Sequence, residues 1–348
     1  MCVNVIDPYN VITDEAMPTL GLALDPTVVK RQFRRHLSRV TEHVRMIRLL
    51  EIRVVRYKPK RRCVIEYDIN YPQPDGQVSA VTLIGKIRNG RFGKNGYRLL
   101  EQIWEKGFQA TNPDGISVPE PIAMIPKLQL WLQRKVAGKE ATELLNTNKA
   151  LNLARRIAEA SYKLHSSTVR IEKNHTMDDE LQILDQCMNK LCQTHPDLRD
   201  RVELLMTKAH QLGKSLSGNR TCGIHRDFYS DQLIVSDERL WLLDFDLYCN
   251  GDPGLDIGNF IGHITEYSLR TFGDADALLD IETALEEHFI ALSGEQIRHS
   301  VRIYTLLTLI RHIYLSSLFT ERQNFTLQIL ALCERRFNDQ IRTLQNAS

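Results

Sequence analysis

The chain has 348 residues and a mass of 40.1 kDa, more than one hydrophobic core usually organises, so two lobes or domains are expected. Hydrophobic residues make up 43% and charged residues 25% of the sequence, which excludes an intrinsically disordered chain. The 45 Lys and Arg against 43 Asp and Glu leave a net charge of +2. This balance argues against a nucleic-acid coat protein or a polybasic membrane protein.

The sequence contains no uninterrupted apolar run of the ~18 residues that a membrane-spanning helix requires, so we expect no membrane segment. The first basic residue is Lys30, which follows several acids, so no secretory signal is expected either. The seven cysteines are scattered and never spaced C-x-x-C. Free thiols in the reducing cytoplasm are the simplest interpretation.

The first third of the chain predicts one helix followed by an antiparallel sheet. Asp25-Pro26 is typical of a helix start, and apolar residues then recur at helical spacing from Val29 to Val44. The period changes to alternation from about Leu49. Strands are predicted near 49–57, 63–69, 78–87, 122–125 and 128–136, with a short helix near 99–104.

The remainder of the chain is predicted to be mainly helical. Helices are expected at 148–165, 178–193, 198–215, 275–292, 295–319 and 324–345, with a strand–turn–strand unit at 222–247. We therefore expect an α+β protein with a small antiparallel-sheet lobe at 1–135 and a larger helical lobe at 136–348. A ligand cleft between two such lobes is the default site hypothesis.

The residues that indicate chemistry lie between Cys222 and Asp246. Two short apolar runs in this segment predict a hairpin that brings Gln232 close to Asp244 and gathers both at the end that carries Asp227. A base, an amide oxygen and a carboxylate in this arrangement suit phosphoryl transfer.

This segment resembles the aminoglycoside phosphotransferase and choline kinase family, relatives of the protein kinases. His225-Arg226-Asp227 is similar to the H-x-D catalytic loop, and Asp244-Phe245-Asp246 to the D-x-D metal motif. The G-D-P-x-x-D stretch that ends at Asp256 matches the next family motif. The specific match covers 222–260, and the order of the two lobes extends it loosely over 50–320. The resemblance implies a two-lobed protein-kinase-like fold that uses ATP and Mg²⁺.

The resemblance also implies a role for each motif residue. Asp227 would be the catalytic base, and the metal ligands would be Gln232, Asp244 and Asp246. Support of the catalytic loop would come from His225, Asp252 and Asp256. One position departs from the family pattern, because Gln232 stands where the family has Asn. The amide oxygen is retained on a side chain one methylene longer, which alters the geometry of metal coordination.

In the small lobe, the family pattern implies a lysine at the nucleotide phosphates and a glutamate that holds it. Lys86 lies in the third sheet strand, on the same face as Thr82 and Ile84 by alternation. Glu101 on the following helix is the favoured partner, with Glu105 as the alternative. The alternative is that Lys86 does not bind nucleotide and is an edge-strand lysine whose ammonium group is solvated.

The turn between the first two long strands is basic where a phosphate loop would hold glycines, and Lys60 and Arg61 are its candidate phosphate contacts. An exposed basic turn is the alternative. A nucleic-acid patch is poorly supported, since Tyr57 is the one aromatic residue in the run. Adenine is expected against the connecting strand, at backbone groups of Leu132, Gln133 and Arg134.

The segment 273–288 carries six acids and no Lys or Arg. It predicts either an acidic surface for a cationic acceptor or a solvated helix face. For the whole chain we expect an ATP-dependent phosphotransferase acting on a hydroxyl of a small molecule, such as an aminoglycoside-like compound, a sugar, an amino-alcohol or a natural product. The alternatives are a nucleotide-binding pseudokinase with a regulatory role and a scaffold that uses the basic turn.

Overall fold

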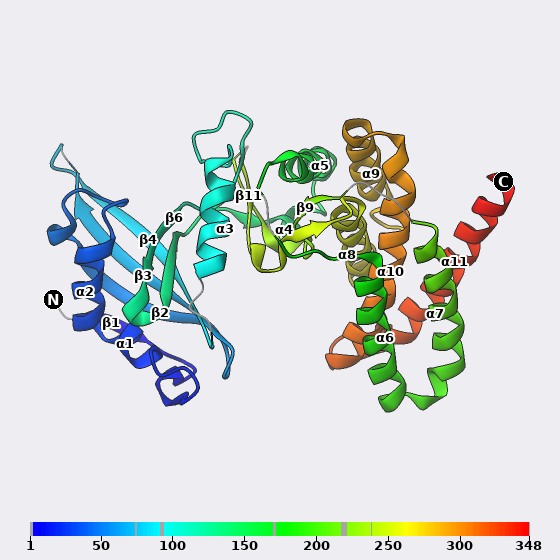
Figure 1. Ribbon diagram of the computed structural model, residues 1–348, viewed down its shortest axis with the longest axis horizontal. Helices are drawn as coiled ribbons and strands as arrows, with labels where there is room; N and C mark the ends of the chain where they lie inside the picture. Colours follow the sequence, from blue (N-terminus) through cyan, green and yellow to red (C-terminus); the bar gives the residue numbers. More distant parts are fainter. Residues whose placement is uncertain are drawn as a thin grey trace. The chain divides into compact units, whose positions relative to one another are not determined.

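The computed structural model describes residues 3–73, 75–90, 94–169, 172–216, 221–237 and 239–347. The chain divides into two compact units, which are described separately (Figure 1). Unit 1 comprises Met1–Gly138 and Asp237–Leu243, and unit 2 comprises Lys139–Ser236 and Asp244–Ser348. The expected mixture of a sheet-rich first part and a helical second part is confirmed. The lobe boundary at 135/136 stays a prediction.

Unit 1 is built on a six-stranded sheet in the order β1-β2-β3-β4-β7-β6. Its strands are β1 Asn4–Ile6, β2 Arg48–Lys58, β3 Arg62–Pro72, β4 Val78–Arg88, β6 Pro121–Ile125 and β7 Leu130–Arg134. Strand β1 runs parallel to β2, and all other neighbours are antiparallel. The register aligns Val64, Lys86 and Trp131 across three adjacent strands.

The two faces of this sheet differ, as the alternation in the sequence predicts. Helices α1 (Leu20–Leu24) and α2 (Pro26–His36) cover one face, where the ring of Phe33 packs edge-on against Tyr67 at 5.2 Å and the Tyr67 hydroxyl donates to the Ala23 carbonyl. Leu83 and Ile87 of β4 are buried on this face. Lys86 therefore lies on the opposite face, because successive strand residues point to opposite sides.

Helix α2 is shorter than the sequence pattern predicts. The Asp25 side chain accepts hydrogen bonds from the backbone of Thr27 and Val28, as expected for an N-cap, but the helix ends at His36. Val40 and Val44 still pack against the core of unit 1, although they do so from a turn and a short 3-10 helix. Their spacing therefore reflected burial and not helical structure.

The rest of unit 1 contains α3 (Lys94–Glu105) and a small parallel pair formed by β5 (Ile116–Ser117) and β11 (Arg239–Leu242). Figure 1 shows α3 in cyan after the long strands, where the sequence predicts a short helix.

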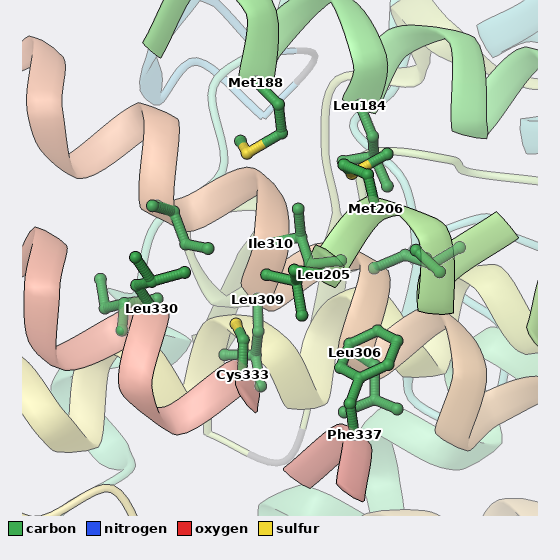
Figure 2. Packing of buried hydrophobic residues seen from close by; sticks show 14 of the residues in the cluster. Leu184, Met188, Leu205, Met206, Leu306, Leu309, Ile310, Leu330, Cys333 and Phe337 are labelled. Atoms are coloured by element: carbon green, nitrogen blue, oxygen red, sulfur yellow. The ribbon is translucent and has the colours of Figure 1, made fainter. Parts of the chain in front are cut away.

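Unit 2 is mainly helical. Its helices are α4 Ala141–Leu144, α5 Ala150–Ser166, α6 Met177–Thr194, α7 Arg199–Lys214, α8 Gly254–Phe272, α9 Leu279–Ser293, α10 Arg298–Leu318 and α11 Thr326–Ala347. Its short strands are β8 Lys139–Glu140, β9 Cys222–Ile224, β10 Leu233–Ser236 and β12 Cys249–Gly251. Figure 2 shows how apolar residues of α6, α7, α10 and α11 interlock, among them Met188, Leu205, Ile310 and Phe337. None of the helices in the described part of the chain is long and apolar enough to cross a membrane.

Helix α8 is a long helix that the sequence analysis failed to predict. Glycine has a low helix propensity, and Gly254, Gly258 and Gly262 recur every four residues along it. A Cβ atom at each of these glycines would collide with α10; at Gly258 it would lie 2.6 Å from the Tyr304 Cβ and the Val301 carbonyl oxygen. The glycines are thus the surface through which α8 and α10 approach each other closely.

We predict that Gly258→Ala destabilises the protein by about 1–3 kcal/mol, because the added methyl group forces α8 and α10 apart. Gly21→Ala is the matched control, since a Cβ at Gly21 in α1 would meet no atom within 4 Å. Urea unfolding curves measure both effects. Equal stability of the two variants would show that the close approach of α8 and α10 is not required.

Candidate active site

The H-R-D motif at 225–227 and the D-F-D motif at 244–246 meet in unit 2. Strand β9 leads into the H-R-D motif and pairs antiparallel with β12, so that Ile224 lies opposite Cys249. The ring of His225 contacts Phe228 at 5.6 Å and Phe245 at 5.0 Å between ring centroids. Because Phe245 is the central residue of the D-F-D motif, this ring packing brings the two motifs together.

The carboxylate of Asp256, near the start of α8, fixes the backbone that precedes Asp227. It is fully buried and accepts hydrogen bonds from the backbone N–H groups of His225 at 2.8 Å and Arg226 at 2.7 Å. The Nε2 atom of His165 on α5 lies 2.8 Å from the same carboxylate. Arg226 has a φ of +70°, a strained conformation for a residue with a side chain, and the bond to its N–H stabilises that conformation.

Asn259, one helical turn further along α8, fixes the backbone that follows Asp227. Its Nδ2 atom donates to the Phe228 carbonyl at 3.0 Å, and its Oδ1 atom accepts from the Thr308 hydroxyl at 3.3 Å. Helix α8 therefore holds the chain on both sides of Asp227, whose side chain is half-buried. The sequence analysis missed Asn259, although its i, i+3 spacing from Asp256 on one helix face was the available signal.

Asp252 lies at the start of the same helix. Its Oδ1 atom accepts from the Gly254 N–H at 2.8 Å, which satisfies one of the free amide groups at the beginning of α8.

One carboxylate oxygen of Asp244 is buried. Its Oδ1 atom is buried and has no hydrogen-bond partner among the residues that the structure describes, and its φ is +53°. Burying an unpaired carboxylate oxygen is unfavourable, and a bound cation would compensate for it. Asp246 follows in the short 3-10 helix Phe245–Leu247 and is half-buried.

The described residues contain no cluster of three His, Cys, Asp or Glu side chains that could hold a metal by themselves. A Mg²⁺ ion usually takes one or two protein ligands and completes its shell with phosphates and water. The described residues therefore do not form a metal centre built by protein ligands alone. The unpartnered Asp244 oxygen fits a Mg²⁺ ion that the protein and the nucleotide phosphates would hold together.

Gln232 is oriented by a contact that the sequence did not reveal. Its Nε2 atom donates to the Tyr229 hydroxyl at 3.1 Å. The Tyr229 ring stacks on His263, with centroids 4.5 Å apart and planes 17° apart. Burial lowers the pKa of His263 to about 3, so this stacking partner is neutral. With the nitrogen of the amide committed to Tyr229, the oxygen of Gln232 is the atom left for a cation.

In unit 1, Lys86 is half-buried, with its Nζ atom 5.0 Å from the centroid of the Trp131 ring. The carboxylate of Glu101 accepts from Arg39 at 2.6 Å and from the Tyr97 hydroxyl at 3.4 Å. Glu105 is exposed. The pairing of Lys86 with a helix glutamate therefore stays a prediction, and Glu101 already has a cationic partner.

The basic turn between β2 and β3 is held by Asp14. The Oδ2 atom of Asp14 accepts from the Tyr57 hydroxyl at 2.7 Å and from the Lys60 N–H at 2.8 Å. These bonds lower the pKa of Asp14, the Lys60 amide being the largest cause, and the same carboxylate raises the pKa of Tyr57 to about 12. The turn is thus braced through its backbone, while the side chains of Lys60 and Arg61 remain exposed.

The connecting strand β7 offers fewer backbone groups than expected. The N–H of Arg134 donates to the Glu120 carbonyl at 2.9 Å, and the Arg134 side chain pairs with the Glu120 carboxylate at 2.8 Å. This N–H therefore already has a partner within unit 1, and the adenine contact with backbone groups of Leu132, Gln133 and Arg134 stays a prediction. Gln133 is 8% exposed and lies opposite Ile84 of β4.

Four of the six acids of 273–288 are paired with an arginine or buried. Three of them pair with arginines of α10 and α11, in the pairs Asp276–Arg336, Glu286–Arg302 and Glu287–Arg298. Glu282 is buried and accepts from the Thr265 hydroxyl. Asp274 and Asp280 are exposed, so the choice between an acidic surface for a cationic acceptor and a solvated helix face stays a prediction.

The geometry of both units matches known proteins. The model of the Phosphotransferase enzyme family matches residues 99–291, more than half of the chain. The chain belongs to this family. The match spans the H-R-D, D-F-D and G-D-P-x-x-D motifs, and it begins after Lys86. No curated protein sequence matches the chain.

Solved structures confirm the kinase-like two-lobed fold that the resemblance implied. A putative aminoglycoside phosphotransferase from Ralstonia eutropha is 14% identical, with a TM-score of 0.63 and coverage of 90% of this chain and 97% of that one. A choline/ethanolamine kinase family protein from Mesorhizobium loti is 15% identical, with a TM-score of 0.54 and coverage of 93% and 94%. An amicoumacin kinase in complex with AMP-PNP, Ca²⁺ and Ami is 15% identical, with a TM-score of 0.52 and coverage of 90% and 96%.

We predict that Asp256→Asn lowers the stability of this phosphotransferase family member by about 1.5–3 kcal/mol. The variant loses hydrogen bonds to a charged acceptor and turns an amide NH₂ group toward backbone donors. Asp237→Asn is the control, because Asp237 is exposed in a turn with a φ of +50°, which Asn adopts readily. Urea unfolding monitored by circular dichroism measures the difference. An unchanged Asp256→Asn midpoint would contradict the bracing of the H-R-D loop by Asp256.

Proposed function

We propose that this protein is an ATP-dependent phosphotransferase that moves the γ-phosphoryl group to a hydroxyl of a small molecule. The observation that carries the proposal is the placement of Asp227, whose flanking backbone is held by Asp256 and Asn259 on one helix. A half-buried carboxylate held this firmly can accept a proton at a fixed position. Membership of the family and the fold of the related kinases agree with this activity.

The proposed reaction is a direct displacement. The acceptor oxygen forms a bond to the γ-phosphorus while the bond from that phosphorus to the bridging oxygen of ADP breaks, and the bonding electrons leave with ADP. The acceptor proton passes to a carboxylate oxygen of Asp227, which later releases it to water. The role of Asp227 is therefore to orient the hydroxyl and to take its proton.

The residues that would hold Mg²⁺ are Gln232 and Asp244, with Asp246 as a further ligand. When bound, Mg²⁺ would supply positive charge that offsets the negative charge of the nucleotide phosphates. The buried, unused oxygen of Asp244 supports its assignment, and the anchoring of the Gln232 amide by Tyr229 supports the use of the longer side chain.

The nucleotide would be held by Lys86 at its phosphates, by the exposed side chains of Lys60 and Arg61 in the braced turn, and by backbone groups near Gln133. The related amicoumacin kinase was solved with AMP-PNP, which supports ATP as the donor. The acceptor would be an aminoglycoside-like compound, a sugar, an amino-alcohol or a natural product. The pseudokinase alternative rests on Gln232 and on the missing glycine loop. The Tyr229 contact weakens the first of these grounds, because it supplies an orientation for Gln232.

We predict that the wild-type protein consumes ATP with at least one member of a panel of hydroxylated metabolites and antibiotics. Asp227→Asn should lower the turnover rate about 10²–10⁴-fold, the usual contribution of a positioned base, while nucleotide binding is retained. Asp237→Asn should leave the rate unchanged. ADP release and nucleotide affinity are measured in parallel. A wild-type protein that turns over ATP with no acceptor and binds nucleotide equally well without metal would be a regulatory protein instead.

A second prediction concerns Tyr229. Tyr229→Phe removes the hydroxyl that anchors the Gln232 amide, so the Mg²⁺ concentration for half-maximal turnover should rise about 3–10-fold, as for the loss of one hydrogen bond. The rate at saturating Mg²⁺ should change little. Electron paramagnetic resonance of Mn²⁺ in the presence of AMP-PNP should show a matching loss of affinity.

Tyr9→Phe is the control for this experiment, because Tyr9 is an exposed tyrosine of unit 1. A Tyr229→Phe variant that is slower by the same factor at every Mg²⁺ concentration, with unchanged Mn²⁺ binding, would exclude an action of Tyr229 through the metal ligand.

A further inference from the structure

Unit 1 carries a basic hollow that the proposed reaction does not use. The hollow has a volume of about 710 Å³ and is lined by Thr27, Lys30, Arg31, Arg34, Arg35 and Arg45. Five of these six residues are cations, and none is acidic or aromatic. The first five belong to α2, and Arg45 lies in the 3-10 helix Val44–Met46 that follows it.

The cations of the hollow lack acidic partners among the residues that the structure describes. Other arginines of unit 1 are paired, such as Arg39 with Glu101 and Arg134 with Glu120. Between residues 26 and 48 the sequence holds seven Lys and Arg against one acid, in a chain whose net charge is only +2. The positive charge is therefore concentrated at this place and not spread over the protein.

This concentration destabilises the helix that carries it. Lys30 and Arg34 form one like-charge i, i+4 pair on α2, and Arg31 and Arg35 form another. Cations in the last turn interact favourably with the helix dipole, which accounts for Arg34 and Arg35 but not for Lys30 and Arg31 one turn earlier. A bound anion would turn this repulsion into attraction.

The hollow and the proposed phosphate contact Lys86 belong to opposite sides of the unit 1 sheet. The opposite side of α2 buries Val29 and Phe33 against the sheet, on the face where Phe33 meets Tyr67. Lys86 lies on the other face of that sheet. The hollow is therefore a separate feature of unit 1 and not an extension of the phosphate contacts at Lys86.

We propose that the basic hollow binds a compact molecule carrying several phosphate groups. Four of its five cations are arginines, whose planar guanidinium group matches the geometry of phosphate. Positions 30 to 35 span about 7.5 Å of helix axis, which suits a compact cluster of charges better than the extended tract that a nucleic acid requires. The lack of aromatic lining also removes the stacking that single-stranded nucleic acids use.

The test is calorimetric titration of inorganic tripolyphosphate into the full chain and three variants. Binding to the wild type should weaken at least tenfold in Lys30→Gln/Arg34→Gln, should be unchanged in the unit 2 control Arg199→Gln, and should fall as salt is raised. Without ligand, the double variant should melt at the same or a higher temperature than the wild type, because like-charge repulsion has been removed. Lys86→Ala should bind tripolyphosphate at the hollow as the wild type does.

Three results would overturn the proposal. The first is tripolyphosphate binding that is lost in Lys86→Ala and kept in the double variant, since that binding belongs to the nucleotide site. The second is equally tight binding of an oligoglutamate of the same charge, which would indicate recognition of negative charge without phosphate. The third is tighter binding of an RNA duplex than of tripolyphosphate with the same dependence on Lys30 and Arg34, which would make the hollow a nucleic-acid surface. None of these results depends on phosphotransferase activity.

Discussion

The buried carboxylate of Asp256 is the interaction on which the candidate active site depends. A carboxylate that is excluded from water is strongly unfavourable unless hydrogen bonds replace its hydration. Asp256 meets this requirement with the N–H groups of His225 and Arg226 and with the imidazole of His165. The same bonds determine the path of the backbone into Asp227. Through these bonds, helix α8 holds the backbone next to the proposed base Asp227 in a fixed position.

The position of α8 depends in turn on its glycines. Gly254, Gly258 and Gly262 allow α10 to approach so closely that a methyl group at any of them would collide with it. The Thr308 side chain of α10 also completes the hydrogen bonding of Asn259, which holds the Phe228 carbonyl. Helix packing and catalytic-loop geometry are therefore linked through one helix interface.

The sequence predicts the elements whose burial follows a simple period. The alternation from Cys63 to Ile69 indicates β3, and the catalytic motifs indicate the family and the location of Asp227. Helix α8 is not predicted because its glycines have a low helix propensity. Propensity describes an isolated helix, and it contains no information about α10, whose close packing makes the glycines necessary. The helix is predicted to run to Val44, eight residues beyond its end at His36, because Val40 in a turn and Val44 in a short 3-10 helix still pack against the core.

The supporting contacts of the site could not be derived from the sequence for a related reason. The bond from Gln232 to Tyr229 and the bracing of Lys60 by Asp14 join groups whose meeting depends on the folded backbone. No pattern in the chain marks Asp14 as a partner of a turn 46 residues away. Residue type and spacing thus locate the proposed chemistry, while the contacts that orient it emerge only from the tertiary structure.

Amide hydrogen exchange at His225 and Arg226 tests the central claim most directly. If the Asp256 carboxylate holds the H-R-D loop in place, these two amides should exchange only through global unfolding. Their free energy of exchange should then fall with added denaturant as steeply as that of core amides in α10. Fast exchange of both amides that is insensitive to denaturant would show local opening of the loop, and would contradict the view that Asp256 holds Asp227 in place.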